Sequence, residues 1–315
     1  MAFQKVAAYA PAGAAALGLG MASAAFRARP GLTGFDFAVC ADRRGPVTTD
    51  LGVPVLAEHG PGLLERADLV LVLPGAEQIG EPAPRLRSAL RRAHARGATV
   101  AAHCLGVFAL AASGLLDGRE ATTHWQHAGT LAARHPDVTV RAERLYVDQG
   151  RIATGAGAAA GLDLYLHLIR RDHGAGLANA IARLLVVPPH REGGQRQYVD
   201  VPVADGGETE RLAEVVGWAR AHLHERLTLD ALAARALMSR RSFIRYFKAA
   251  TGTTPHAWLR AQRLNLAEEL LETTDLSTER IAERTGYRSA AVLREQFARR
   301  RGLPPRDYRR AFTRR

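Results

Sequence analysis

Apolar residues in the last third of the chain recur at a helical spacing, and the whole pattern occurs twice. In the first copy, the inner face of a short helix consists of Leu229, Leu232, Ala233 and Ala236. A turn at Leu237 and Met238 follows, and a second helix buries Phe243 and Phe247, which share one face because they lie four residues apart. The stretch 227–312 therefore predicts two short helix-turn-helix units.

Small polar residues mark where these helices begin. Candidate N-caps are Thr228, Ser239 and Thr254 in the first copy and Ser277 and Ser289 in the second. Gly252 and Gly302 are expected to end helices in a left-handed conformation, and Pro255 opens a long helix that runs to about Glu272. Two copies are too few for a solenoid, so the pattern favours a protein that binds DNA at two places.

The outer faces of the two second helices carry the candidate DNA contacts. Such a helix lies in the major groove with its N-terminal residues near base edges, and arginine suits forked contacts with guanine and phosphate. The alternative is an ordinary solvated surface, which the duplicated frame makes a poorer explanation. The run 299–301 faces phosphate or solvent. The predicted contacts are Ser239, Arg240, Arg241, Ser242, Arg245, Ser289, Ala290, Arg294 and Arg299.

This stretch resembles the DNA-binding domain of AraC/XylS-type transcription regulators. The likeness rests on the runs 238–243, 252–255, 281–282 and 305–309, with Phe247, Arg263, Leu264, Ala267, Gly286, Ser289, Phe297 and Gly302. It implies two helix-turn-helix modules, joined by the helix from Pro255, on adjacent turns of double-stranded DNA. Val292 and Pro304 depart from the family pattern, since polar residues are usual at both positions. We therefore expect the first module to supply most polar base contacts.

Strand and helix patterns alternate over residues 1–187. Apolar runs predict strands at 3–10, 35–41, 68–73 and 98–102 and a hairpin at 144–154. Helical patterns cover 14–26, 85–96, 106–115, 158–171 and 176–186. This alternation predicts a mainly parallel sheet covered on both sides. Because proline and glycine interrupt the pattern at 188–210, we expect a linker there, between domains at 1–187 and 211–315.

Charge agrees with this division. The chain of 315 residues has a formal net charge of +12, and the part from residue 207 onward holds 22 Arg and Lys against 13 Asp and Glu. The basic excess thus coincides with the segment expected to bind DNA, where neutralised phosphates release counterions.

Composition also limits the setting in which the protein works. Cys40 and Cys104 are the only cysteines, which excludes a disulfide framework and indicates a reducing compartment. The uncharged run 6–26 imitates a signal peptide, but it is rich in Ala and Gly and is broken by Pro11, so a strand, a turn and a helix explain it better. The twelve histidines show no zinc spacing. We therefore expect a cytoplasmic protein with no membrane partner, metal or cofactor.

Cys104 is the sharpest local feature of the first domain. A strand that ends in a cysteine and turns into a helix, with Gly106 two residues later, has the geometry of a nucleophile elbow. The dipole of that helix is expected to lower the thiol pKa, and His124 is a candidate base. The alternative is that Cys104 is a small buried hydrophobic residue.

The first domain is similar to the ThiJ/PfpI-type domain of GlxA-like AraC regulators. The likeness rests on Cys104 and on the runs 113–119, 121–125, 154–157, 160–163 and 184–191. It implies a flavodoxin-like α/β fold, of the class I glutamine amidotransferase type, that senses a small molecule. Enzymes of the wider superfamily add a glutamate from the first helix, where Gly18 stands here. We therefore expect a ligand pocket without turnover, formed around Cys104, His124, Gly75 and His103.

These patterns predict a sequence-specific transcription regulator with an α/β sensor domain and an all-α double helix-turn-helix domain. The sensor domain binds an unknown small-molecule effector, or serves as the surface of a homodimer. The rival interpretation is a cysteine-dependent amidase or hydrolase with an attached nucleic-acid-binding domain. Thiol titration separates the two, because an enzyme needs a Cys104 that reacts rapidly at neutral pH.

Overall fold

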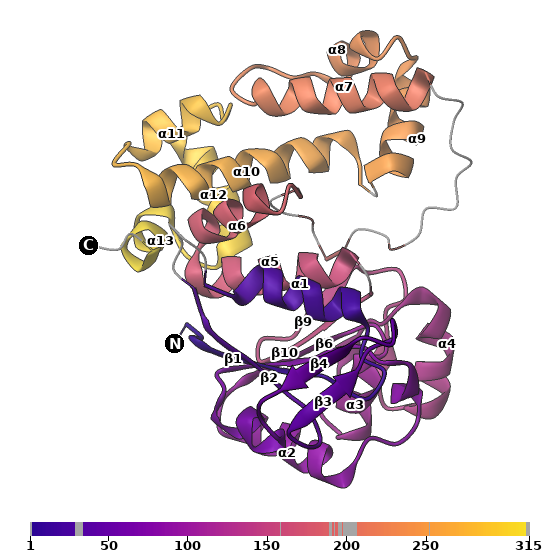
Figure 1. Cartoon of the computed structure of the whole chain (residues 1–315). Helices are drawn as coiled ribbons and strands as arrows, with labels where there is room; N and C mark the ends of the chain where they lie inside the picture. Colours follow the sequence, from indigo (N-terminus) through magenta and orange to yellow (C-terminus); the bar gives the residue numbers. More distant parts are fainter. Residues whose placement is uncertain are drawn as a thin grey trace. The chain divides into compact units, whose positions relative to one another are not determined.

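The computed structural model describes residues 2–28, 34–157, 159–188, 191, 193–194, 197, 207–251 and 253–312. The chain divides into two compact units (Figure 1), a first unit of Met1–Asp172 with Ala178–Tyr198 and a second unit of His173–Leu177 with Val199–Arg315. Most of the expected linker, 188–210, lies outside the described residues, and helix α7 (Gly207–Ala221) already begins within its last four.

A parallel sheet forms the centre of the first unit. Over the described residues its six strands run in the order β2-β1-β5-β6-β10-β9, and β9 alone is antiparallel to its neighbour. Strands β5, β6 and β10 are buried along their whole length, as expected for a sheet covered on both faces. The strands are β1 (Lys5–Tyr9), β2 (Asp36–Cys40), β5 (Leu69–Val72), β6 (Thr99–His103), β9 (Tyr146–Asp148) and β10 (Ile152–Gly155).

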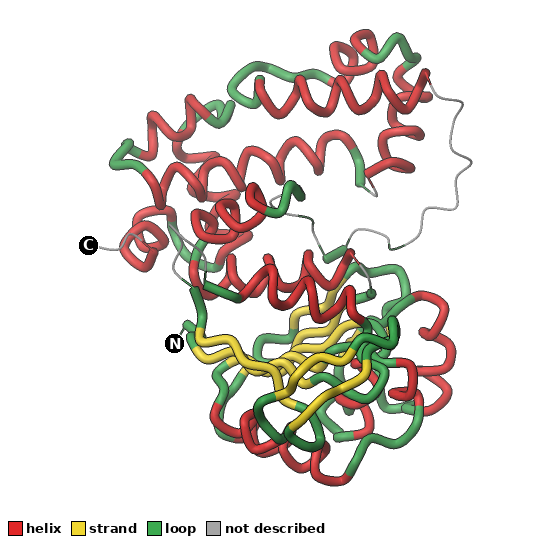
Figure 2. The backbone as a smooth tube through the Cα atoms, viewed as in Figure 1, coloured by secondary structure: helices red, strands yellow, loops and turns green. Residues whose placement is uncertain are grey.

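Helices lie on both sides of this sheet (Figure 2), which confirms the predicted α/β architecture. Helices α1 (Ala16–Phe26) and α5 (Ala159–His173) lie on the same side, and α2 (Pro84–Ala95) and α3 (Gly106–Ala112) on the other. Helix α6 (Ala175–Leu184) follows α5. Ala158, the predicted first residue of α5, lies outside the described residues, and α3 ends three residues before the prediction.

Several short elements were missing from the sequence prediction. Strands β3 (Gly45–Thr48) and β4 (Pro54–Ala57) form a separate hairpin, and β7 (Glu120–Ala121) pairs with β8 (Thr139–Val140). Two-residue strands are too short to show an alternating pattern. Helix α4 (Trp125–Arg134) was missed because its N-cap is the ring of His124, which is not among the usual capping residues.

The second unit consists of helices built around two hydrophobic cores. Within the described residues, one core surrounds Phe243, Phe247 and Trp258, the other surrounds Leu293 and Phe297, and the long helix α10 contributes to both. The helices are α7 (Gly207–Ala221), α8 (Leu229–Arg235), α9 (Arg240–Thr251), α10 (Pro255–Thr273), α11 (Thr278–Arg284), α12 (Ala290–Arg301) and α13 (Pro305–Phe312). This confirms the two predicted helix-turn-helix units.

The turns of the two modules share one backbone geometry. Leu237 (φ 55°) and Gly286 (φ 73°) both adopt the left-handed conformation. Each donates its N–H to the residue three positions earlier, and the next N–H bonds five positions back. The helix-ending conformation expected of Gly302 is confirmed (φ 72°), whereas Gly252 lies outside the described residues. The second turn contains one extra residue, Arg288, before its serine cap.

Candidate DNA-binding surface and ligand site

Helix α9 presents a basic outer face. Ser239 accepts a hydrogen bond from the N–H of Ser242 (3.1 Å) and donates one to its hydroxyl (3.0 Å), so the two serines cap the helix together. Phe243 and Phe247 point into the core. The remaining predicted contacts of this helix, Arg240, Arg241 and Arg245, are exposed, and so is Lys248.

Helix α12 presents a more apolar start. Ser289 accepts a hydrogen bond from the N–H of Val292 (3.4 Å), as predicted for a cap. Ala290 is half-buried against the module's own core, whereas Ala291 and Val292 are exposed. Arg294 is exposed and lies 2.6 Å from the Glu279 carboxylate of α11. The apolar side chains available at this helix start are therefore those of the two residues after Ala290.

Several arginines hold helices together instead of facing solvent. Arg301 makes a two-pronged contact with Glu268, at 2.7 and 2.6 Å, and that carboxylate is fully buried. Arg301 is thus bound within the unit and largely shielded from solvent, whereas Arg299 is exposed. Arg263 donates to the carbonyl oxygens of Leu223 and Glu225. Sequence reasoning missed the buried pair, although Glu268 occupies the inner face of a helical apolar pattern with Leu264, Ala267 and Leu271.

Cys104 occupies an elbow between β6 and α3, as predicted. Its φ is 53°, and its N–H donates to the carbonyl oxygens of Gly155 (3.0 Å) and Ala156 (2.7 Å) at the end of β10. A Cβ on Gly106 would collide with the backbone oxygen of Val72, so the close approach of α3 to β5 requires glycine there.

The structure brings Cys104 and His124 together. A Cβ built on Gly157 would lie 3.1 Å from the Cys104 Sγ and 3.0 Å from the His124 Cδ2, so both side chains flank this glycine. The Thr123 hydroxyl donates to the Cys104 carbonyl oxygen (2.7 Å), which ties the segment before His124 to the elbow.

The electrostatics of the pair do not favour a thiolate. Burial raises the pKa of Cys104, and the opposing effect of the Leu105 N–H is smaller. The predicted lowering of this pKa by the α3 helix dipole is therefore wrong, because desolvation outweighs it. Burial lowers the pKa of His124, with a further contribution from His127. Both groups are consequently neutral at neutral pH.

His103 belongs to a different, fully buried environment. Its Nε2 lies 2.9 Å from the Tyr165 hydroxyl, and desolvation lowers its pKa to about 4. A Cβ on Gly161 of α5 would approach the His103 ring to 2.9 Å, and one on Gly18 of α1 would lie 3.6 Å from it. The Gly75 N–H donates to Gln78 Oε1 (2.8 Å). His103 therefore packs towards α1 and α5.

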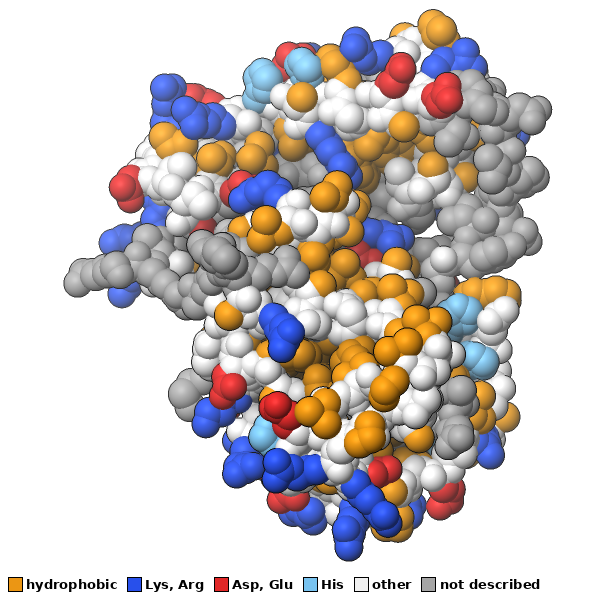
Figure 3. All heavy atoms as spheres, viewed as in Figure 1, with side chains coloured by type: hydrophobic (Ala, Val, Ile, Leu, Met, Phe, Trp, Pro, Cys, Tyr) orange, Lys and Arg blue, Asp and Glu red, His pale blue; other side chains and the backbone are white. Residues whose placement is uncertain are grey.

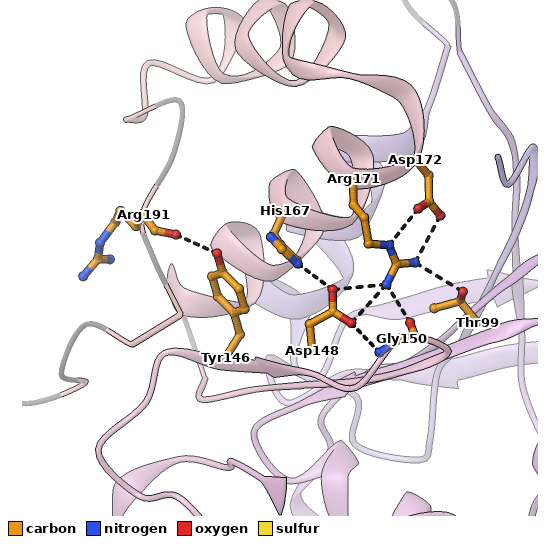
Figure 4. Close-up of polar contacts among 8 residues, drawn as sticks. All are labelled: Thr99, Tyr146, Asp148, Gly150, His167, Arg171, Asp172 and Arg191. Carbon is orange, nitrogen blue, oxygen red and sulfur yellow. Dashed lines mark hydrogen bonds and ion pairs between the residues drawn. The ribbon is translucent and has the colours of Figure 1, made fainter. Parts of the chain in front are cut away.

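A polar network that the sequence did not reveal joins the edge strand β9 to α5 (Figure 4). The His167 Nε2 lies 2.7 Å from an Asp148 carboxylate oxygen, and Arg171 contacts both oxygens of that carboxylate at 3.1 and 3.2 Å. Tyr146 lies against the His167 ring, and its hydroxyl donates to the Arg191 carbonyl oxygen (2.9 Å). The network extends from the sheet edge to Arg191, which lies within the expected linker.

Comparison with known proteins agrees with this division. Residues 4–171 match the DJ-1/PfpI family, and residues 232–311 match a helix-turn-helix domain. The HTH-type transcriptional regulator CdhR of Pseudomonas aeruginosa is 31% identical over 261 residues, which cover 83% of this chain and 77% of that protein. The HTH-type transcriptional regulator ArgR of the same organism is 34% identical over 237 residues, with 75% and 72% covered.

Solved structures support the fold. A ThiJ/PfpI family protein from Pseudomonas syringae superposes with a TM-score of 0.53 at 20% identity, covering 75% of this chain and 91% of that one. An AraC family transcriptional regulator from Pseudomonas putida gives 0.51 at 21% identity, covering 57% and 99%. The flavodoxin-like α/β fold of the first unit is thereby confirmed. The chain belongs to the DJ-1/PfpI family, among the HTH-type transcriptional regulators that join such a domain to an AraC-type DNA-binding domain.

Proposed function

We propose that this transcription regulator reads double-stranded operator DNA mainly through α9 and holds it in place through α12. The observation that carries the proposal is the division of side chains on these helices. Phe243 and Phe247 of α9 are buried, while Arg240, Arg241 and Arg245 remain exposed. Exposed arginines at the start of a recognition helix suit guanine edges.

The second helix contributes a different kind of contact. Ala291 and Val292 are exposed at its start, where apolar side chains suit thymine methyl groups. Arg294 and Arg299 are exposed further along and suit phosphate oxygens. A DNA-bound regulator works beside the chromosome, so we also propose a cytoplasmic location.

Binding to DNA tests this assignment at fixed salt, after the operator has been found by genome-wide mapping of bound sites. Arg241→Ala should weaken operator binding by about 1–3 kcal/mol and relax base preference at one position. Arg91→Ala on α2 of the first unit removes the same charge and should leave both properties unchanged. Equal affinities of the two variants would remove Arg241 from the reading surface.

The first unit, in this proposal, binds a small molecule beside Cys104 and His124 without turning it over. A neutral thiol is a weak nucleophile, and burial raises the pKa of Cys104. At Gly18, where related enzymes carry an acid, a Cβ would already lie 3.0 Å from Pro74 Cδ. Slow alkylation of Cys104 at pH 7, measured by mass spectrometry, is expected. Rapid alkylation, together with hydrolytic turnover that Cys104→Ser abolishes, would favour the rival enzyme.

We further propose that the first unit forms a homodimer through α1 and the β3–β4 hairpin. Hydrophobic side chains gather over these elements (Figure 3), and Leu17, Leu51 and Leu56 are 60%, 73% and 64% exposed. A groove of about 270 Å³ is formed by residues of α1, β2 and β4, and its lining includes Arg27 and Glu58. In a two-fold dimer each contact occurs twice, and we propose that Arg27 of each copy pairs with Glu58 of the other.

Charge reversal tests the dimer in light scattering. Arg27→Glu and Glu58→Arg should each shift the protein towards monomer, and the double variant should restore the dimer. A monomeric wild type, or single variants that remain dimeric, would contradict this interface.

A further inference from the structure

The chain that leaves the first unit is fastened to the segment that carries His124. The Gln197 side-chain amide nitrogen donates to Thr122 Oγ1 (3.0 Å) and to the carbonyl oxygens of Thr123 (2.8 Å) and Arg144 (2.9 Å). Its amide oxygen accepts the backbone N–H of Trp125, the first residue of α4, at 2.9 Å. One side chain thus binds residues that precede and follow His124 in the sequence.

Arg191, Gly193 and the Gln197 backbone also form contacts near the edge of the sheet. The Gly193 carbonyl oxygen accepts the N–H of Leu145 (2.8 Å), and the Gln197 N–H donates to the Glu143 carbonyl oxygen (3.2 Å). A Cβ on Gly193 would lie 2.8 Å from the Tyr146 ring, so only glycine fits this approach. The Arg191 guanidinium lies 3.1 Å from the Asp163 carboxylate. The backbone carbonyl oxygen of Arg191 accepts a hydrogen bond from the Tyr146 hydroxyl (Figure 4). These contacts hold Arg191, Gly193 and Gln197 against residues 143–146, at and just before the start of β9.

The segment 122–125 faces the elbow on its other side. The Thr123 hydroxyl donates to the Cys104 carbonyl oxygen, and the Thr122 N–H donates to Thr154 Oγ1 (2.9 Å) on β10. His124 flanks Gly157 together with the Cys104 Sγ. The partners of Gln197 in this segment thus precede and follow His124 of the candidate ligand site, so a ligand that moved the segment would also move the acceptors of the Gln197 amide.

We propose that Gln197 is a latch that couples occupancy of the Cys104–His124 site to attachment of the chain leading to the DNA-binding unit. The proposal rests on the ligand site argued above. Among the described residues, Gln197 is the last one attached to the first unit before α7 begins at Gly207.

Coupling between two sites is reciprocal, which provides a test without a known ligand. Iodoacetamide serves as the probe of the Cys104 site, and amide hydrogen exchange of 143–147 and 191–197 reports attachment of the segment. In the full-length protein, Gln197→Ala should raise both the alkylation rate of Cys104 and the exchange rate by at least about fivefold. Protein carrying an alkylated Cys104 should show the faster exchange without any substitution.

Two variants keep this test decisive. Gln126→Ala removes an exposed glutamine from the same end of α4 and should change neither rate. Gln197→Glu keeps the oxygen that accepts from Trp125 but presents a carboxylate to the Thr123 and Arg144 carbonyl oxygens. It should therefore raise both rates as the alanine variant does, and it replaces that variant in the test if Gln197→Ala folds poorly. Faster exchange without faster alkylation, or no change in either, overturns the latch. The ligand site itself is tested by the alkylation of Cys104 in the unsubstituted protein, so such a result leaves that part of the proposed function standing.

Discussion

Replacing Gly286 with alanine adds one carbon atom, the Cβ, to the turn of the second module. Gly286 has a φ of 73°, and a Cβ there would collide with the backbone oxygen of Leu223 and lie 2.9 Å from the Arg263 guanidinium carbon. Arg263 donates to the carbonyl oxygens of Leu223 and Glu225, at 3.0 and 2.7 Å. The added methyl group therefore strains its own backbone and displaces an arginine that binds α10 to the segment after α7.

The magnitude follows from these contacts. A left-handed alanine lowers the free energy of unfolding by about 1–2 kcal/mol. The smaller conformational freedom of the unfolded chain offsets about 0.4–1 kcal/mol of this loss. Losing a hydrogen bond from a charged group costs about 1.5–3 kcal/mol. We expect Gly286→Ala to lower the free energy of unfolding of the second unit by about 3 kcal/mol. For a unit of this size, that is a drop in Tm of about 10 °C or more.

Tryptophan fluorescence in urea measures this loss, because the units need not unfold together. The three tryptophans are Trp125, Trp218 and Trp258, and only the first lies in the first unit. A Trp125→Phe background therefore reports the second unit alone. A loss below about 1 kcal/mol would refute the reasoning, since it would mean that the turn relaxes without cost.

Leu237 provides the matched control. It occupies the equivalent left-handed position in the first module, at φ 55°, but its side chain is 77% exposed. Leu237→Gly removes about 1–2 kcal/mol of backbone strain and loosens the unfolded chain by about 0.5–1 kcal/mol. The same assay should show an unchanged or slightly raised stability, opposite in sign to the effect at Gly286.

Three further outcomes are expected. Glu268→Gln leaves the Arg301 charge poorly compensated in the core, so urea unfolding should show a loss of about 3–5 kcal/mol, and an unchanged stability would contradict the buried pair. The depressed pKa of His103, about 4 against about 6.5 when unfolded, means that the unfolded chain takes up the proton first as pH falls. The free energy of unfolding of the first unit, measured by thermal unfolding, should thus fall by about 3 kcal/mol as the pH is lowered from 6.5 to 4. His103→Gln should make this pH dependence weaker. Glu279→Gln releases Arg294 for phosphate and should strengthen DNA binding up to about fivefold at fixed salt, whereas weaker binding would show that the carboxylate orients Arg294 for its contact.

The elements that sequence predicted best are those whose signals are local. Thr228, Ser277 and Ser289 all cap helices as expected, because a side-chain oxygen satisfies an N–H only three residues away. The elbow at Cys104 is equally local, since it needs a strand end, a left-handed residue and Gly106. Helix α4 escaped prediction because His124 caps it.

The candidate site was predictable in part. Likeness to a known family placed Cys104 near His124, and the structure brings them together around Gly157. The direction of the Cys104 pKa shift was not predictable, because desolvation comes from several segments and outweighs the helix terminus. His103, expected in the same pocket, turns instead to Tyr165, sixty-two residues away.

The sequence alone determined where helices begin, which faces are apolar, where the chain must turn and that basic charge gathers in the DNA-binding part. Tertiary structure decided what individual polar side chains do. Arg299 and Arg301 look alike in sequence, yet Arg301 is held by the buried Glu268 thirty-three residues away, whereas Arg299 is exposed. The sequence does not distinguish Gln197 from other linker residues, whereas the structure shows its amide bound to the segment 122–125. Periodicity and capping depend on near neighbours, whereas burial, ion pairing and pKa depend on residues that only folding brings into contact.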